Sequence, residues 1–337
     1  STGLDYLPGR YANFEEILEL VKVAKKYNGV YATHVRGVNE KGENDGGLYG
    51  VQEATRICRE TKIPTNISHM HIILNDENKS ETELAIQSRK ELERGYVEEG
   101  LPMMYDVISN ADSGGSTIPY LINFLRPWVV MCGSIENFID KLAYADFVEM
   151  MQEQIDSGKA MMLAIEGIEN SINVVESDNV VYNKTLKTLM QEYNFATPLL
   201  MILELVKKDP YTTMTFVCEG GEEAVEILLS SERAMPSSDG FAFDLDTTLD
   251  LPAPLNRMPH PNNYNYAIRY LTTYGPKRLE DKVYKMTKQV ADFFMIEDRG
   301  EIKEGYYADL VVLKKDCLKA NADAIIDNVQ RLVKSYN

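Results

Sequence analysis

Short apolar segments alternate along the chain with segments in which apolar residues recur every three or four positions. The first kind has the length and composition of β-strands, and the second kind has the spacing of amphipathic helices. The strand-like segments are residues 30–35, 64–69, 102–108, 160–165, 212–218 and 233–237. The alternation predicts a parallel α/β sheet, either open or closed into a barrel.

The helix-like segments carry start and stop signals of their own. Asn13, with Glu16 three residues later, has the form of a capping box, and Asn28-Gly29 supplies the stop for that first helix. Further helices are predicted around residues 54–58, 81–99, 182–193, 198–207, 222–229 and 279–290. Most of them fall between two strand-like segments, as a βα alternation requires.

The pattern changes near residue 295, where the βα units end. Residues 304–313 combine a Gly-Tyr turn with the apolar run Leu310-Val311-Val312-Leu313, which is typical of a β-rich tail. We therefore expect residues 1–295 to form the α/β domain. Residues 296–337 are expected to contribute a C-terminal β segment to a composite small β domain.

Candidate chemistry lies where the predicted strands end. The chain contains four histidines, and two of them, His34 and His69, end apolar strands and open onto polar or glycine-bearing loops. Ser237-Ser238-Asp239-Gly240 repeats this arrangement with a carboxylate. Because sites in parallel α/β folds lie at the carboxyl ends of the strands, these residues predict a metal or catalytic site.

Each of these residues also has a structural interpretation. A strand-end histidine can be a hydrogen-bonded core residue, and Asp239 before Gly240 can bond its own backbone in a turn. Arg36 is as plausibly a salt-bridge residue as a substrate contact. His71 alternates to the same strand face as His69, where it could be a second ligand or a polar pocket residue.

Charge and cysteine usage narrow the class of protein. A formal net charge of −17 argues against a nucleic-acid or anionic-membrane partner, because binding to phosphate depends on clustered lysine and arginine. No apolar stretch is long enough to span a bilayer. The four cysteines lie far apart without a metal or redox spacing, which favours a reducing compartment and hence a cytoplasmic location.

Several motifs resemble, in order, the D-aminoacylase and N-acyl-D-amino-acid deacylase branch of the metal-dependent amidohydrolase superfamily. The opening STGLDYLPG resembles the STGL-Y-PG segment of the family, YATHVR its YATHxR strand, and Ile67-Ser68-His69 its ISH strand. Ser238-Asp239-Gly240 matches SDG, and Pro259-His260-Pro261 matches the PHP loop. The run from Arg299 to Val312 resembles the segment with which the superfamily re-enters its small β domain.

The resemblance implies a TIM-like (β/α) barrel that carries zinc and hydrolyses a carbon–nitrogen bond other than a peptide bond. It implies His34 and His69 as metal ligands and Asp239 as general base and acid. The resemblance begins partway through the family pattern, so the His-x-His and the cysteine ligand of the first part have no counterpart here. We therefore expect an incomplete barrel, the C-terminal portion of such an enzyme. An N-terminal portion or a homo-oligomer would complete the site.

Substitutions in the expected pocket leave the substrate open. His71 replaces a family lysine, Asn262 replaces an arginine suited to gripping a carboxylate, and Ile108-Ser109-Asn110 replaces Tyr-Pro-Tyr. Arg36, Asn110 and His260 complete the set of pocket residues that we consider. Two alternatives to a deacylase follow: a cyclic-amide hydrolase related to dihydroorotase, and a non-catalytic remnant that serves as an assembly or binding module.

Overall fold

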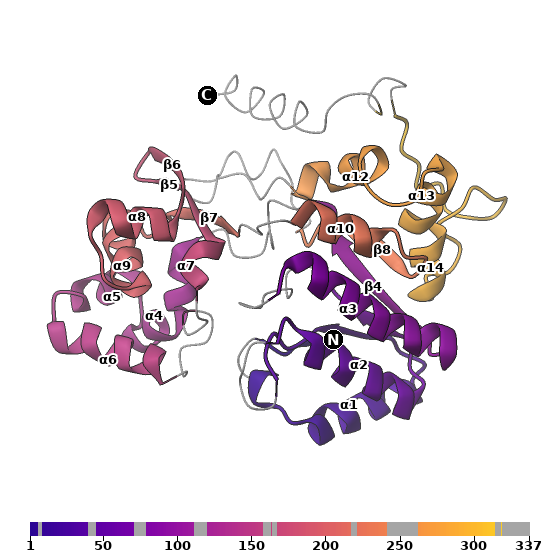
Figure 1. Cartoon of the computed structure of the whole chain (residues 1–337), viewed down its shortest axis with the longest axis horizontal. Helices are drawn as coiled ribbons and strands as arrows, with labels where there is room; N and C mark the ends of the chain where they lie inside the picture. The colour runs from indigo at the N-terminus through magenta and orange to yellow at the C-terminus, as the bar shows by residue number, and fades with distance from the viewer. Residues whose placement is uncertain are drawn as a thin grey trace. The chain divides into compact units, whose positions relative to one another are not determined.

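The computed structural model describes residues 1–5, 9–39, 45–70, 79–110, 120–157, 163, 167–216, 221–240, 262–313 and 318 (Figure 1). The chain forms two compact units. The first unit comprises residues 1–111, 219–239 and 261–337, and the second comprises residues 112–218 and 240–260. The second unit is thus inserted into the chain of the first, and each is described by itself.

A five-stranded parallel sheet organises the first unit. Its strands lie in the order β1 (Thr2–Gly3), β2 (Tyr31–His34), β3 (Thr65–Ile67), β4 (Met103–Ile108) and β8 (Ala234–Ser237). Every neighbouring pair is parallel, so the carboxyl ends of all five strands lie at one edge of the sheet. This confirms the α/β class and the strands predicted at 30–35, 64–69, 102–108 and 233–237.

Helices follow most of these strands, as the alternation predicted. They are α1 (Phe14–Lys26), α2 (Leu48–Thr61), α3 (Glu81–Glu93), α10 (Gly221–Leu229), α12 (Asn262–Thr272), α13 (Leu279–Met286) and α14 (Lys288–Phe293), with the short helices η1 (Gly9–Tyr11) and η3 (Arg94–Glu98). Asn13 caps α1 by accepting a hydrogen bond from the backbone N–H of Glu16 at 2.9 Å. The predicted helix 81–99 is α3 continued by one π-helical stretch, η3.

The core of the first unit lies between the sheet and these helices. α3 and α10 pack side by side, and α10 also contacts β4 and β8 (Figure 1). The buried residues include Val51 and Cys58 from α2, Ile67 from β3, Tyr105 from β4 and Leu228 from α10. Period-2 apolar residues on the strands and period-3.6 apolar residues on the helices therefore meet in this core. A second buried cluster, which includes Ile17 and Ile57, packs α1 against α2.

Two buried lysines of α13 satisfy the carboxyl ends of two other helices. The ammonium group of Lys285 donates to the backbone oxygens of Leu229 and Ser231, at 2.7 and 2.6 Å. Lys282 donates to the oxygens of Tyr270 and Leu271, both at 3.1 Å. Because the last carbonyls of a helix have no partner within it, these cations hold α13 against α10 and α12.

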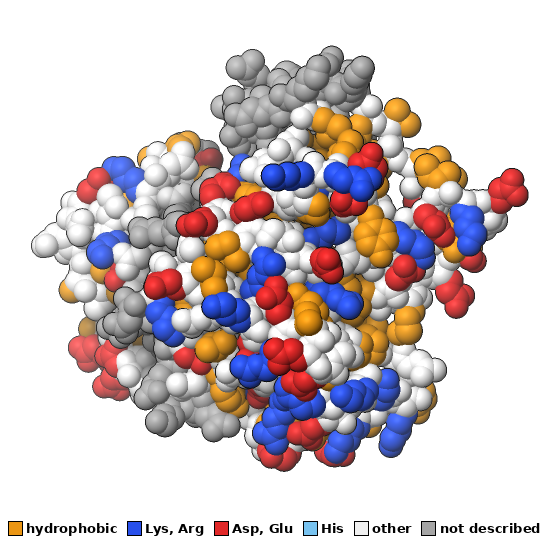
Figure 2. All heavy atoms as spheres, turned by 45° about the vertical axis from the view of Figure 1, so that its right-hand side comes forward, with side chains coloured by type: hydrophobic (Ala, Val, Ile, Leu, Met, Phe, Trp, Pro, Cys, Tyr) orange, Lys and Arg blue, Asp and Glu red, His pale blue; other side chains and the backbone are white. Residues whose placement is uncertain are grey.

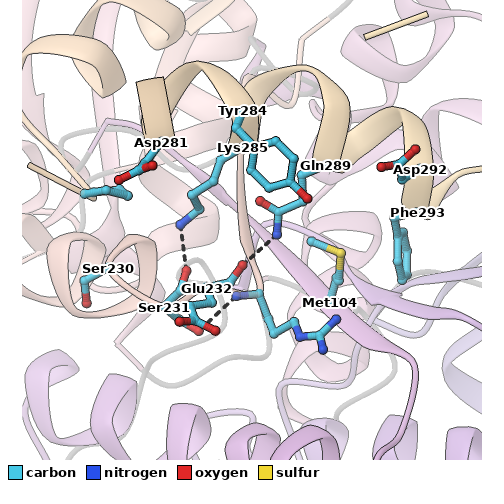
Figure 3. A pocket seen from close by; sticks show the side chains of 12 residues that line it. Met104, Ser230, Ser231, Glu232, Asp281, Tyr284, Lys285, Gln289, Asp292 and Phe293 are labelled. Carbon is cyan, nitrogen blue, oxygen red and sulfur yellow. Dashed lines mark hydrogen bonds between the residues drawn. The ribbon is translucent and has the colours of Figure 1, made fainter. Parts of the chain in front are cut away.

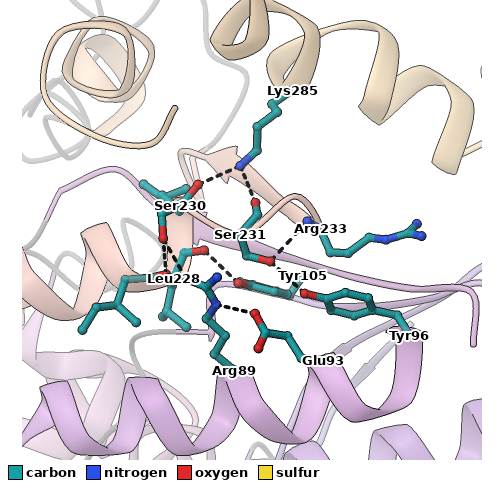
Figure 4. A network of polar contacts seen from close by, with 11 residues as sticks. Arg89, Glu93, Tyr96, Tyr105, Leu228, Ser230, Ser231, Arg233 and Lys285 are labelled. Carbon is teal, nitrogen blue, oxygen red and sulfur yellow. Dashed lines mark hydrogen bonds and ion pairs between the residues drawn. The ribbon is translucent and has the colours of Figure 1, made fainter. Parts of the chain in front are cut away.

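Lys285 belongs to a larger polar network around the end of α10 (Figure 4). Tyr105 donates its hydroxyl to Leu228 O at 2.7 Å, and Arg89 donates to Ile227 O at 2.8 Å. Arg89 also pairs with Glu93 at 2.7 Å. These side chains come from β4, α3 and α13, so the end of α10 is where three elements of the unit are joined.

The second unit has a different architecture. Its strands β5 (Ile172–Ser177), β6 (Val180–Thr185) and β7 (Thr213–Phe216) form an antiparallel sheet in the order β6-β5-β7. Its helices are α4 (Arg126–Cys132), α5 (Ile135–Lys141), α6 (Ala145–Asp156), α7 (Ile168–Ser171), α8 (Leu186–Tyr193) and α9 (Pro198–Lys208), preceded by η4 (Leu121–Leu125). Their apolar side chains form a separate buried cluster that includes Trp128, Phe138 and Ile202.

Two sequence predictions were wrong in this unit. The segment 212–218 contains a strand, but that strand pairs antiparallel with β5 and does not extend the parallel sheet. The helix predicted at 182–193 starts only at Leu186, because residues 180–185 form β6. Asp178 and Asn179, with φ of 47° and 62°, form the two-residue turn that joins β5 to β6.

The C-terminal segment is described only in part. Within the described part of that segment, residues 301–313 form no strand, so the C-terminal β segment of a composite small β domain stays a prediction. Val311 and Val312 are 82% and 96% exposed, and among the described residues no strand pairs with this apolar run. The domain boundary near residue 295 stays a prediction. The strand predicted at 160–165 lies outside the described residues, apart from Leu163.

The surface and the cysteines can be followed only where the structure describes them. Figure 2 shows one face on which acidic and basic side chains are interspersed. Cys58 and Cys132 are free thiols. In the described part of the chain, no helix has both the length and the apolar character needed to cross a membrane.

Candidate metal-binding and catalytic site

The structure brings His34 and His69 together at the carboxyl edge of the parallel sheet. β2 ends at His34, and His69 follows β3 by two residues. The Nδ1 atom of His34 lies 3.2 Å from the Nε2 atom of His69, and the ring centroids are 4.6 Å apart at an angle of 63°. Adjacent parallel strands that end at the same edge therefore aim two imidazole nitrogens at one point.

Asp5 determines which nitrogen of His34 faces His69. Its Oδ2 atom lies 3.2 Å from His34 Nε2, and its Oδ1 atom accepts from the backbone N–H of Gly37 at 2.9 Å. A carboxylate beside Nε2 favours the tautomer in which that nitrogen carries the proton, which leaves Nδ1 as the basic nitrogen. The same carboxylate–histidine pairing is usual for histidines that bind metals.

Asp106 joins the ends of three strands. Its Oδ1 atom accepts from the backbone N–H of His69 at 2.8 Å and from the hydroxyl of Ser237 at 2.7 Å. Its Oδ2 atom accepts from the side-chain amide of Asn66 at 2.7 Å. Burial raises the pKa of Asp106, and these hydrogen bonds act in the opposite direction.

Asp239 follows β8 by two residues, on the same edge of the sheet. Its backbone has a φ of 45°, in the left-handed region that a residue with a side chain seldom adopts. Burial, together with the negative charge of Asp106, raises the pKa of Asp239 to about 6, and His34 opposes this shift. A carboxyl group with such a pKa can both accept and donate a proton near neutral pH.

Of the remaining predicted pocket residues, the structure describes the side chains of Arg36 and Asn110. Arg36 donates to the Glu53 carboxylate at 3.0 Å and to Arg10 O at 2.8 Å, which matches its salt-bridge interpretation. Asn110 follows β4 and is 6% exposed. His71 and His260 lie outside the described residues. Asn262 begins α12, but its side chain is also outside the described part.

The two histidines fit a shared zinc ion. A tetrahedral zinc bound by nitrogens at about 2.0–2.1 Å holds two of them about 3.3–3.4 Å apart, close to the 3.2 Å between His34 Nδ1 and His69 Nε2. Among the residues that the structure describes, however, no group of three or more His, Cys, Asp or Glu side chains could hold a metal ion. The described residues could thus supply at most two of the ligands that such an ion needs.

Two residues of the site were not identified from the sequence. Asp5 lies within the STGLDY motif, directly after the segment that forms β1, and its acidic side chain at a strand end was an available signal. Asp106 is a charged residue inside the apolar strand Met103–Ile108, where an unpaired carboxylate would be costly. A carboxylate inside a buried strand is itself a reason to expect hydrogen-bond donors around it.

A cavity of about 840 Å³ lies elsewhere, beside the amino ends of β4 and β8. It is lined by Met104, Arg233, Lys285, Gln289 and Phe293, among others (Figure 3). Lys285 is bound to two backbone oxygens there, and Gln289 donates to Glu232 O at 2.6 Å. These polar groups serve the backbone, so the candidate chemistry lies at the opposite edge of the sheet.

Comparison with known proteins agrees with this geometry. The chain is 25% identical over 325 residues to the D-aminoacylase of Alcaligenes xylosoxydans xylosoxydans, a match that covers 93% of the chain. The chain is a homologue of D-aminoacylase. No protein-family model matches it. The match covers 51% of the relative, so the homologue spans about half the length of the curated protein.

Solved structures show the same fold in D-aminoacylase and in a second deacylase. D-aminoacylase, which defines a novel subset of amidohydrolases, superposes with a TM-score of 0.57 at 22% identity. The N-acyl-D-glutamate deacylase of Bordetella bronchiseptica, solved with zinc and a phosphonate inhibitor, superposes with a TM-score of 0.56 at 19% identity. In each case the D-aminoacylase homologue covers 91% of its own length and 51% of the other chain. The chain therefore shares its fold with about half of each of these two proteins.

Proposed function

We propose that the chain is part of a zinc-dependent hydrolase that cleaves an amide carbon–nitrogen bond other than a peptide bond, of the N-acyl-D-amino-acid deacylase type. The observation that carries the proposal is the 3.2 Å spacing of the His34 and His69 nitrogens at the carboxyl edge of the sheet, in a homologue of D-aminoacylase. The other ligands would come from outside the described residues, through an N-terminal portion or a second copy of the chain.

The residues of this chain have separable roles in such a reaction. His34, oriented by Asp5, and His69 would hold the zinc. Zinc bound there would act as a Lewis acid toward a carbonyl oxygen and make water a better nucleophile at neutral pH. Asp239, with a pKa of about 6, would accept the proton of the attacking water and deliver it to the leaving nitrogen.

Direct metal analysis tests the site. We expect purified protein to bind zinc, and His34→Ala or His69→Ala to lose most of that binding. His260→Ala is the matched control, because it removes a histidine to which we assign no ligand role. Equal zinc content in all four proteins would contradict the proposal.

The substrate class is a small-molecule amide, and its form needs a separate experiment. The replacements His71, Asn262 and Asn110 in the expected pocket permit a cyclic amide in place of an N-acyl-D-amino acid. A screen of both classes with zinc-loaded protein would decide between them, because hydrolysis of the cyclic set alone rejects the deacylase assignment. We place the reaction in the cytoplasm, on the basis of the cysteine pattern.

A non-catalytic binding or assembly module is the second candidate. It is favoured by the fact that the described residues supply two histidine ligands, whereas zinc enzymes commonly use three or more protein ligands. A protein that binds zinc but hydrolyses no amide, alone or together with a polypeptide that supplies the missing ligands, would favour this function over the deacylase.

A further inference from the structure

Asp106 occupies an unusual position for a charged residue. It lies in the middle of β4, which is otherwise the apolar run Met103–Ile108. Its neighbour Tyr105 points to the opposite face of the sheet, where its ring is fully buried and its hydroxyl bonds to α10. The carboxylate of Asp106 therefore lies on the face from which the strand ends carry His34, His69 and Asp239.

Hydrogen bonds reach Asp106 from both strands that flank β4. Asn66 and His69 belong to β3 and its end, and Ser237 is the last residue of β8. Ser237 is also two residues before Asp239. One carboxylate thus joins the histidine-bearing end of β3 to the aspartate-bearing end of β8.

The bond to His69 holds a backbone conformation that would otherwise be costly. His69 has a φ of 35°, in the left-handed region, and leaving that conformation would swing its ring away from β2. Ser68 still pairs with β2 through its N–H and Thr33 O, at 2.9 Å, so the chain turns abruptly at the next residue. Asp106 Oδ1 receives the N–H of that residue at 2.8 Å.

We propose that Asp106 is a positioning residue that holds the His69 imidazole against His34 and so sets the nitrogen spacing of the metal site. It acts through the backbone of His69, without touching the metal. The consequence for zinc rests on the proposed function, whereas the consequence for His69 does not. A residue with this role must keep an oxygen acceptor toward His69 N–H, but it does not need a negative charge.

Two substitutions separate positioning from charge. Asp106→Ala removes every acceptor. Asp106→Asn keeps an oxygen for His69 N–H and Ser237, and its new amide can donate to Asn66 once the Asn66 amide turns over. Asn66 Oδ1 has no hydrogen-bond partner to lose, and the Ser68 hydroxyl, which now accepts from the Asn66 amide at 3.3 Å, can donate to the oxygen instead.

The readouts are zinc affinity and the NMR signals of the His69 amide and imidazole in zinc-free protein. For Asp106→Ala, we expect zinc affinity to fall tenfold or more and the His69 signals to shift. We expect Asp106→Asn to stay close to the wild type in both. Asp106→Val, with a β-branched side chain suited to a strand and no acceptor, replaces the alanine variant if that protein does not fold.

The matched control is Asp45→Ala, which removes another carboxylate that accepts a backbone N–H, that of Tyr49 at 2.9 Å, but lies away from the histidines in the chain. It should leave zinc affinity and the His69 signals unchanged. The inference is overturned if Asp106→Asn loses zinc as completely as Asp106→Ala, which would indicate a need for charge or direct ligation. It is also overturned if the alanine variant keeps wild-type His69 signals. Should the wild type bind no zinc, the proposed function fails, and the His69 signals alone decide the role of Asp106.

Discussion

The two edges of the parallel sheet use polar side chains for different purposes. At the amino edge, Lys285, Arg89 and Tyr105 all donate to backbone oxygens near the end of α10 (Figure 4). At the carboxyl edge, the side chains of His34 and His69 contact each other, and nearby carboxylates hold them in place. The first set satisfies the backbone, whereas the second set orients side chains toward one point.

Non-glycine residues with positive φ occur at both edges of the sheet, but in different settings. His69 and Asp239 adopt positive φ at the carboxyl edge, where no glycine relieves the strain. At the amino edge, Asn28 and Lys62 also have positive φ, of 55° and 52°, but they lie at the carboxyl ends of α1 and α2, where a left-handed residue commonly ends a helix. Strain concentrated where titratable groups converge is typical of functional sites, and the difference teaches which buried polar cluster to test for chemistry.

The largest effect should come from Asp5 at the carboxyl edge. Asp5→Ala removes the partner of His34 Nε2, so both the tautomer and the ring orientation are lost. We expect zinc affinity to fall about 10- to 100-fold, or about 1.4–2.7 kcal/mol, measured by competition with a chromophoric chelator. Asp5→Asn keeps one acceptor and should be intermediate. Unchanged affinity in both variants would remove Asp5 from the site.

The converse experiment at the amino edge is Lys285→Met. It leaves Leu229 O and Ser231 O without their donor in a buried place, which is offset in part by no longer burying a cation. We expect the free energy of unfolding in urea to fall by about 2 kcal/mol, with zinc affinity unchanged. Lys22→Met, which breaks an exposed pair with Glu19, should change stability by less than about 0.5 kcal/mol. A loss of zinc affinity in Lys285→Met would mean that the two edges are not independent.

The sequence predicted the first unit better than the second because its signals are local. Each parallel strand is a short apolar run bounded by polar residues, and a helix of matching period follows it. β6 was missed because it is an edge strand in which Val180 and Val181 are exposed, so burial leaves no period-2 pattern. β7 was found, but nothing local distinguishes an antiparallel from a parallel partner.

The residues of the candidate site were likewise predicted where the signal is local and missed where it is not. His34, His69 and Asp239 were selected because rare or acidic residues at strand ends are visible in the sequence itself. Asp5 and Asp106 were missed because their partners are distant: Asp5 lies 29 residues from His34, and Asp106 lies 37 residues from His69. A contact of that range is known only once the register of the strands is known.

A pH titration of stability sharpens the contrast at the amino edge. Burial, reinforced by Arg89 and opposed by Glu226 and Glu232, lowers the pKa of Lys285 to about 8. Between that value and the usual lysine value near 10.4, Lys285 binds more protons in the unfolded chain, so its contribution to stability rises with pH, whereas the raised pKa of the buried Cys58 thiol acts in the opposite direction. We expect a gain of about 1–2 kcal/mol from pH 8 to 9.5, followed by urea unfolding.

Lys285→Met should abolish most of this rise, and Lys22→Met should not. The window closes near pH 10, because the raised pKa values of Tyr105, Tyr270 and Tyr274 make the folded chain keep protons that the unfolded chain loses. If the stability of the wild type did not change with pH in this range, the Leu229 and Ser231 carbonyls would stabilise the charged form of Lys285 as well as water does.

The smallest effect on stability is expected for Tyr105→Phe. This substitution also gives the closest comparison between the two edges. Tyr105 and Asp106 are consecutive in β4 and serve opposite faces of the sheet, so the two substitutions start from almost the same point in the chain. Loss of the hydroxyl removes one buried hydrogen bond, to Leu228 O at 2.7 Å, and should lower the free energy of unfolding by about 1 kcal/mol. Zinc affinity and the His69 NMR signals should stay at wild-type values. If Tyr105→Phe instead shifted the His69 signals as Asp106→Ala is expected to, β4 would transmit changes between its faces, and the amino-edge network would have to be counted as support for the metal site.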